Sequence, residues 1–317
     1  MFVNQATPYY EPSGRAPGAG VVLFLLVGIF AAWILGVVYT VVLAYIPFIF
    51  ISILGTVGFG GGLGVVCLLL VRGGKLRAPF NVSIFAAIVT FMGLWLHWAF
   101  FSALFVHRAV EESPGLMSLY LFYLSSPAEI IGLAKVLLAD GHFSIGKSSS
   151  TNVAGAMLGG LWLIEALIIF GCTVYLARAQ AKEPFSEASD RWAEKEDLPR
   201  VLPHVEDHAG MKIALETGDF SPLLNAPAKD DNDPRHAQLT LHTVEDDPDC
   251  RYLTLVNVTI ITDKKGKEQR KSVTVVQHLH IRHELCQKLR DMFGPDSQAE
   301  LPVSPESPMP SEPSELP

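Results

Sequence analysis

The sequence predicts an α-helical multi-pass membrane bundle followed by a small cytoplasmic α+β module. Half of the 317 residues are hydrophobic, and no Asp, Glu, Lys or Arg occurs among the 56 residues between Arg15 and Arg72. Charge is unevenly distributed, because residues 1–177 contain 7 basic and 6 acidic side chains, whereas residues 178–317 contain 17 and 26. The chain therefore divides into an apolar half and an acidic polar half.

Four apolar stretches are long enough to cross a bilayer. A helix rises about 1.5 Å per residue and the hydrocarbon core is about 30 Å thick, so the 56 uncharged residues predict two spans rather than one. Pro47 lacks a backbone donor and disfavours helix before it, which places the break near residues 39–47, where Tyr39 and Tyr45 suit an aromatic belt at the headgroups. The predicted spans cover about residues 20–42, 48–71, 80–106 and 153–176, after a flexible N-terminus over residues 1–17.

Basic residues near the span ends predict the orientation. Three lie in the loop 72–79 and three more follow the fourth span between residues 178 and 191, whereas the turn between the first two spans contains none. Loop 107–151 has only three in 45 positions. Since positively charged loops stay in the cytoplasm, we expect a plasma-membrane protein with both termini cytoplasmic.

Glycines recur four residues apart in the second and fourth spans. This spacing forms a groove that lets a neighbouring helix approach closely within the bilayer. Packing within one bundle and a homo-oligomer interface both remain open as its role. The glycines concerned are Gly58, Gly62, Gly60, Gly64, Gly155 and Gly159.

Two ionisable residues lie inside the predicted spans, His97 in the third and Glu165 in the fourth. Counted from the outer ends of their helices, their depths differ by roughly 4–5 Å at 1.5 Å per residue, which is within side-chain reach. An acid in lipid is costly and needs a partner or a proton. We therefore expect a hydrogen-bonded pair, either as a structural contact or as a proton or ion site.

The long outer loop contains one predicted helix, over residues 127–139. Ser126, Pro127 and Glu129 have the spacing of an N-cap, a first-turn proline and the third-position glutamate of a capping box. The helix is amphipathic and too short to span, so we expect it to lie in the outer interface of the lipid bilayer.

The spacing of apolar residues changes along the polar half of the chain. Residues 178–234 are a polar connector, and from residue 236 apolar and polar residues alternate in three runs that end before a helical pattern at 284–293. This predicts an α+β module over residues 235–293, with a three-stranded antiparallel meander and a C-terminal helix. Residues 294–317 are rich in Pro, Ser and Glu and predict a disordered tail.

Three patterns suggest chemistry. Residues 141–148 match the phosphate-binding pattern G-x-x-x-x-G-K-S, but a membrane helix follows, which favours a simple loop. His204 and His208 are four apart with acids between them, and His278 and His280 share one strand face; for each pair a metal site is the alternative to a solvated surface. No catalytic set assembles, so we expect no cofactor or metal, and the acidic balance argues against nucleic-acid binding.

The leading functional interpretation is a non-enzymatic integral membrane protein. Its bundle would anchor a cytoplasmic module that binds or senses an unknown protein partner, and glycine-lined helix faces would allow a homo-oligomer. The alternative is an oligomeric small transporter, or an ion or proton channel, that uses Glu165 and His97. One buried acid in four spans is too little for a translocation path through a monomer.

Overall fold

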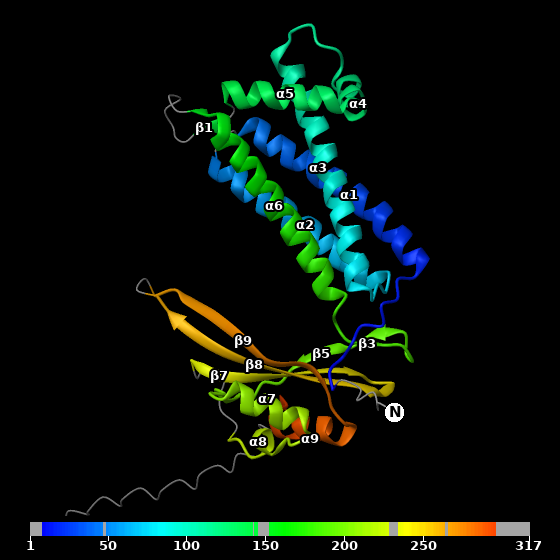
Figure 1. Cartoon of the computed structure of the whole chain (residues 1–317), viewed down its shortest axis with the longest axis vertical. Helices are drawn as coiled ribbons and strands as arrows, with labels where there is room; N and C mark the ends of the chain where they lie inside the picture. The colour runs from blue at the N-terminus through cyan, green and yellow to red at the C-terminus, as the bar shows by residue number, and fades with distance from the viewer. Residues whose placement is uncertain are drawn as a thin grey trace, which may run out of the picture. The chain divides into compact units, whose positions relative to one another are not determined.

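The computed structural model describes residues 8–46, 49–141, 143–144, 152–227, 234–263 and 266–295. The chain forms two compact units (Figure 1). The helical unit comprises Glu11–Phe185, and the sheet unit comprises Ser186–Pro317 together with Met1–Tyr10.

Four long apolar helices make up most of the helical unit. They are α1 (Gly18–Tyr45), α2 (Ile49–Gly73), α3 (Pro79–Ala109) and α6 (Gly155–Gln180). Each is long and apolar enough to cross a membrane, which confirms the prediction of four long apolar helices as candidate spans. Large apolar side chains point outward, and Leu26 is 67% exposed. Such an outer surface is compatible with an integral membrane protein, because a soluble protein rarely exposes large apolar patches.

Small residues bring the helices together. In α1 every fourth residue is buried, through Gly20, Phe24, Gly28, Ala32, Gly36 and Thr40. In α2, a Cβ on Gly60 would lie 2.8 Å from Ile169 Cα, and one on Gly64 would lie 3.0 Å from the Cys172 carbonyl oxygen. These two glycines therefore let α6 approach α2 at backbone contact.

The other four predicted packing glycines have no such close approach. A Cβ on Gly58 or Gly155 would meet nothing within 4 Å. At Gly62 and Gly159 the nearest described atoms belong to leucine side chains, at 3.7 and 3.5 Å, which is ordinary contact. Homo-oligomerisation through these positions stays a prediction.

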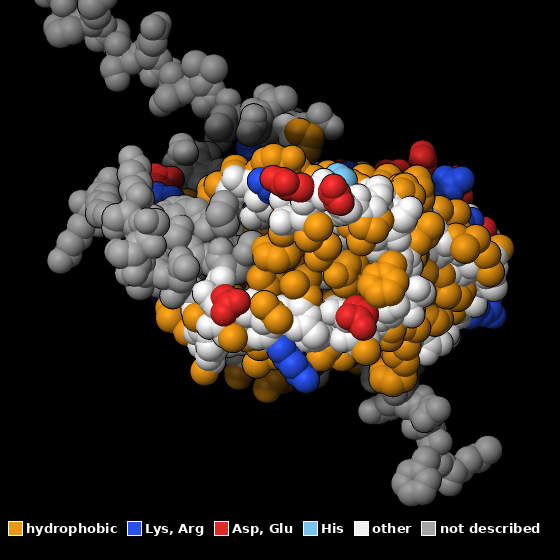
Figure 2. Space-filling model, turned by 90° about the horizontal axis from the view of Figure 1, so that it is seen from above, with side chains coloured by type: hydrophobic (Ala, Val, Ile, Leu, Met, Phe, Trp, Pro, Cys, Tyr) orange, Lys and Arg blue, Asp and Glu red, His pale blue; other side chains and the backbone are white. Residues whose placement is uncertain are grey.

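Two shorter helices, α4 (Leu116–Ser125) and α5 (Pro127–Asp140), follow α3 and are bent by 103° at Ser126. The predicted capping box does not form, because Ser126 makes no side-chain cap bond; its backbone N–H bonds Tyr123 at the end of α4 while its carbonyl accepts from Glu129. Figure 2 looks down on this end of the unit and shows patches of apolar side chains with a few acidic and basic ones among them. That surface suits the interfacial placement predicted for residues 127–139.

Strands β1 (Phe143–Ser144) and β2 (Asn152–Val153) pair antiparallel before α6. Most of the G-x-x-x-x-G-K-S pattern between them lies outside the described residues, and so does the predicted tail from residue 296 onward.

The sheet unit is built on five antiparallel strands in the order β5-β7-β8-β9, with β6 beside β7. Its strands and helices are β3 (Phe185–Ser186, at the boundary), β4 (Arg191–Trp192), β5 (Glu194–Asp197), β6 (Leu202–Pro203), α7 (His208–Glu216), α8 (Ser221–Leu224), β7 (Arg235–Val244), β8 (Asp247–Thr262), β9 (Glu268–His280) and α9 (His283–Phe293).

The sheet is wider than the predicted three strands, because the supposed connector contributes β5 and β6. All four residues of β5 are charged, so the segment has no apolar alternation to mark it as a strand. It is held through its register with β7 and through Glu196, whose carboxylate accepts two bonds from the Arg290 guanidinium of α9 at 2.6 and 3.0 Å.

Helices α7, α8 and α9 cover one face of the sheet (Figure 1). Leu239 and Leu241 of β7 pair with Leu255 and Leu253 of β8 on that face. Helix α9 buries Cys286, Leu289 and Phe293, spaced as one helical face, against them.

The first described residues of the chain extend the far edge of β9. Tyr9 forms a β-bridge with Leu279, the Tyr10 N–H donates to the His278 carbonyl at 2.9 Å, and the His280 N–H donates to the Pro8 carbonyl at 2.7 Å. The structure therefore differs from the predicted flexible N-terminus over residues 8–10. A segment this short has no periodicity from which the pairing could be predicted.

Candidate functional site

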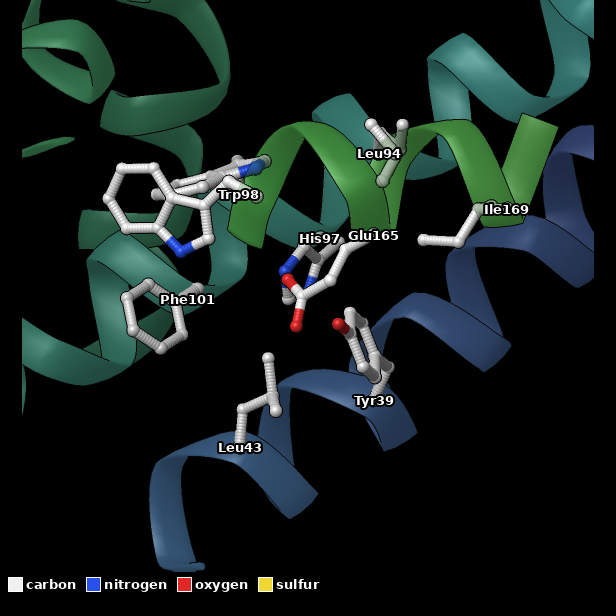
Figure 3. Close-up of a pocket in the computed structure, with 10 residues that line it drawn as sticks. Tyr39, Leu43, Leu94, His97, Trp98, Phe101, Glu165 and Ile169 are labelled. Atoms are coloured by element: carbon white, nitrogen blue, oxygen red, sulfur yellow. The ribbon is translucent and has the colours of Figure 1, made fainter. Parts of the chain in front are cut away.

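A small pocket lies inside the helical unit, between α1, α3 and α6 (Figure 3). Its volume is about 70 Å³. Both ionisable residues that the sequence singles out, His97 and Glu165, line it, and Tyr39 is its third polar side chain. The remaining lining residues are apolar or aromatic: Leu43, Leu94, Trp98, Phe101, Trp162, Ala166 and Ile169.

Glu165 is held by hydroxyl groups of neighbouring helices. Its side chain is buried, at 7% exposure, and Oε1 accepts a hydrogen bond from the Ser52 hydroxyl of α2. The Thr56 hydroxyl donates to the Ser52 carbonyl at 2.9 Å, so the 2.9 Å bond between Thr56 and Tyr39 has the Tyr39 hydroxyl as donor. This chain fixes Ser52, and the Tyr39 and Thr56 hydroxyls also lie within hydrogen-bonding reach of the carboxylate.

His97 is held by Thr40 of α1. The Thr40 hydroxyl donates its only proton to the Gly36 carbonyl at 2.8 Å, so its oxygen accepts the 2.8 Å bond from His97 Nδ1. The hydrogen-bond network thus assigns the proton of the neutral ring to Nδ1, and Nε2 is the acceptor nitrogen. The ring also packs on Tyr39, with centroids 4.7 Å apart.

The predicted pairing of His97 with Glu165 takes a different form. The two side chains border the same pocket, and Figure 3 shows the Glu165 carboxyl in front of the imidazole. His97, however, hydrogen-bonds to Thr40 of α1, and Glu165 to hydroxyls of other helices that include Ser52 of α2.

The sequence interpretation missed these hydroxyl partners and misplaced Tyr39. That residue is 4% exposed and hydrogen-bonded within the bundle, whereas a belt residue would have its ring on the outer surface. The available signal was the spacing of Ser52 and Thr56, four residues apart on one face of an apolar helix.

Aromatic rings form one wall of the pocket. Trp98 of α3 meets Trp162 of α6 edge to face, with centroids 4.9 Å apart, and Phe101 lies 5.8 Å from Trp98. Edge-to-face pairs of this kind add about 0.5–1.5 kcal/mol beyond area burial. The three rings therefore support one another along one side of the pocket.

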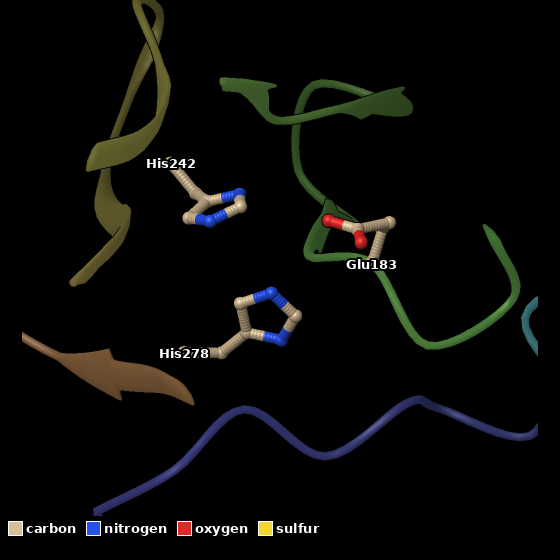
Figure 4. Close-up of side chains that lie close together, drawn as sticks. All are labelled: Glu183, His242 and His278. Atoms are coloured by element: carbon tan, nitrogen blue, oxygen red, sulfur yellow. The ribbon is translucent and has the colours of Figure 1, made fainter. Parts of the chain in front are cut away.

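The sheet unit contains a second group of ionisable residues. His242 of β7 and His278 of β9 meet edge to face at 4.6 Å (Figure 4). Thr254 of β8 joins them, since its hydroxyl lies 3.3 Å from His242 Nε2 and accepts from the His278 N–H at 3.1 Å. His278, which shares a strand face with His280 in the sequence pattern, lies beside His242, while His280 bonds the Asp249 carbonyl at 3.0 Å.

The pattern of His204 and His208 has a structural role in the described fold. Asp207 is the N-cap of α7, accepting from the Gly210 N–H at 2.9 Å, and His208 Nε2 lies 2.6 Å from the Asn257 amide nitrogen. The two rings are 6.4 Å apart. Asp207 is therefore used as a helix cap rather than as a catalytic base.

No protein-family model, characterised protein or solved structure matches the chain.

Proposed function

We propose that the chain is a non-enzymatic integral membrane protein in which a four-span bundle anchors a cytoplasmic domain that binds or senses a protein partner. The observation that carries the proposal is the division of the chain: apolar helices of spanning length on one side and a sheet unit with its own buried core on the other.

The pairing of residues 8–10 with β9 supports an even number of spans. These residues precede α1 and β9 follows α6, so their hydrogen bonds support a topology in which both ends of the bundle emerge in the same compartment. A span formed by α4 and α5 would make the number odd. Bent by 103°, helices of 10 and 14 residues reach roughly 23 Å end to end at 1.5 Å per residue, which is less than about 30 Å of hydrocarbon.

The basic residues support a cytoplasmic location for that compartment. The Gly14 N–H donates to the Arg77 carbonyl and the Arg77 N–H to the Arg15 carbonyl, at 2.9 and 2.8 Å, so the N-terminal segment and the α2–α3 loop lie at the same end of the helical unit. Arg15, Arg72, Lys75 and Arg77 gather there, which is the charge excess of a cytoplasmic face.

Site-directed labelling tests this topology. In intact cells a membrane-impermeant maleimide is expected to label Glu112→Cys, in the exposed α3–α4 loop, and to label Ile213→Cys of α7 only after permeabilisation. Labelling of the native Cys250 in the sheet unit should be low. Burial, and to a smaller extent the charge of Asp247, raises the pKa of its thiol to about 12, and maleimide reacts with the thiolate form. The reverse labelling pattern would contradict the proposed orientation.

The sheet unit also offers a surface for a partner. Ile261 of β8 and Val273 of β9 are 42% and 53% exposed. Ile261 pairs with Gln269, and Val273 pairs with Asn257, so both apolar side chains lie on one face of the β8–β9 hairpin. A photo-crosslinking amino acid at Val273 is expected to give a discrete adduct in cells, whereas the same group at Ile213, also apolar and exposed, is expected to give none. Equal adducts at both positions, or none at Val273, would contradict partner binding here.

A second candidate is an oligomeric transporter or proton channel, and the pocket favours it. A larger pocket of about 280 Å³, lined by Ala44, Phe105, Arg108 and Ala109, shares Phe101 with the pocket of Glu165 and His97. The two therefore adjoin at Phe101. The signature of this function is pH-dependent flux in proteoliposomes that Glu165→Gln abolishes.

A further inference from the structure

We infer that the pocket between α1, α3 and α6 is a binding site for a small primary ammonium ion, such as methylammonium. The inference concerns binding alone, and it depends neither on anchoring of the sheet unit nor on translocation. It rests on four properties of the lining: the charge, the acceptors, the aromatic wall and the size.

The charge comes from Glu165. A carboxylate in the membrane interior is costly unless it meets a positive charge or a proton. The ten lining residues include no Lys or Arg, and the hydroxyls of Ser52, Thr56 and Tyr39 supply hydrogen bonds but no charge. A bound cation would therefore supply the missing countercharge within the described part of the bundle.

The acceptors distinguish the kind of cation. A carboxylate accepts about four hydrogen bonds, so Glu165 can accept more than those from neighbouring hydroxyls, and the Thr40 hydroxyl leaves His97 Nε2 as an acceptor. Acceptor groups from two different helices therefore line one small space. Figure 3 shows the carboxyl directed into the space between Tyr39 and Leu43. A primary ammonium has three N–H donors and satisfies both acceptors, whereas a quaternary ammonium has none.

The aromatic wall explains why the cation is organic rather than a metal ion. Tyr39, Trp98, Phe101 and Trp162 line the same space, and the faces of aromatic rings attract ammonium groups electrostatically. A metal ion such as Na⁺ or Mg²⁺ requires several oxygen ligands, and Glu165 and Tyr39 are the only lining side chains that carry oxygen.

The size sets an upper limit on the ligand. The volume of about 70 Å³ is less than half of that of a cavity of ~150 Å³ that holds benzene, so the pocket suits only a small ligand. Methylammonium fits this volume, with its N–H groups on Glu165 and His97 and its methyl group against the rings.

Saturation-transfer NMR on the full chain in detergent micelles tests the proposal. Irradiation of aromatic protons is expected to transfer signal to the methyl group of methylammonium, and much less to tetramethylammonium at the same concentration. Glu165→Gln is expected to weaken binding at least tenfold, while Glu129→Gln, an acid of α5 outside the pocket, retains the wild-type signal.

A second variant separates loss of binding from loss of folding. Ala166→Leu fills the pocket without touching the carboxylate, so a monodisperse Ala166→Leu protein is expected to bind at least tenfold more weakly. Three results would overturn the ammonium site. The wild type could show no transfer to methylammonium up to tens of millimolar, or Glu165→Gln or Ala166→Leu could show the same transfer as the wild type. Transfer to tetramethylammonium could also be as strong as transfer to methylammonium. If the wild type shows no transfer, the pocket holds water beside a protonated Glu165.

Discussion

Replacing Gly60 with leucine is expected to destroy the packing of α2 on α6. A Cβ at this position would lie 2.8 Å from Ile169 Cα and 3.4 Å from its carbonyl oxygen, and backbone atoms cannot rotate away as a side chain does. Overpacking commonly costs 1–3 kcal/mol, and we expect about 3 kcal/mol or more here because a whole helix must shift. Without this contact, Ser52 of α2 also loses its place beside Glu165. The measurement is the melting temperature of the detergent-solubilised protein by size-exclusion chromatography after heating.

Gly58→Leu is the matched control for this variant. Gly58 lies half a turn away in α2, and a Cβ there would meet nothing within 4 Å. The substitution changes hydrophobicity and helix propensity as Gly60→Leu does, so its melting temperature should equal or exceed that of the wild type. Equal destabilisation by both variants would show that close helix approach is not the cause.

Leu289→Ala is expected to destabilise the sheet unit by about 2–5 kcal/mol. Leu289 is fully buried between α9 and the sheet, in the core that also contains Leu239, Leu253 and Phe293. Alanine would leave a cavity among side chains fixed by strand pairing on one side and by the helix on the other. Hydrogen exchange of the full chain should show faster exchange in β8, where amide protection reports opening of the sheet.

Ile213→Ala of α7 serves as the control for the core variant. Its side chain is 61% exposed, so truncation removes little buried area and exchange in β8 should stay at the wild-type rate. If Leu289→Ala leaves exchange in β8 unchanged, α9 does not stabilise the sheet in solution.

Much of the fold could be predicted from the sequence because its strongest signals are local. The absence of charge between Arg15 and Arg72 predicts membrane helices without any knowledge of their packing. Strand β5 could not be predicted in this way, because its four charged residues show no alternation of apolar and polar side chains. The strand forms through its contacts with β7 and α9, which are remote in sequence. Residues 8–10 likewise acquire a strand partner that is remote in sequence.

For the candidate site, the sequence identifies the charged groups but not what holds them. Glu165 and His97 stand out because ionisable residues are rare in membrane helices. Their partners, Ser52 and Thr40, are short hydroxyl residues of the kind that also satisfies a helix's own carbonyls, as Thr40 does at Gly36. Which hydroxyls face the interior of the bundle depends on how each of the four helices is rotated about its axis, and the sequence does not give this rotation.

The edge of β9 also has a consequence for biosynthesis. The segment around Tyr9 is made before its partner around Leu279, which follows roughly 270 residues later. During translation this nascent segment must wait, undocked, while the hydrophobic helices enter the bilayer. Bulky insertions placed just ahead of Pro8 would therefore disturb a late step in maturation, even though they lie far from β9 in the sequence.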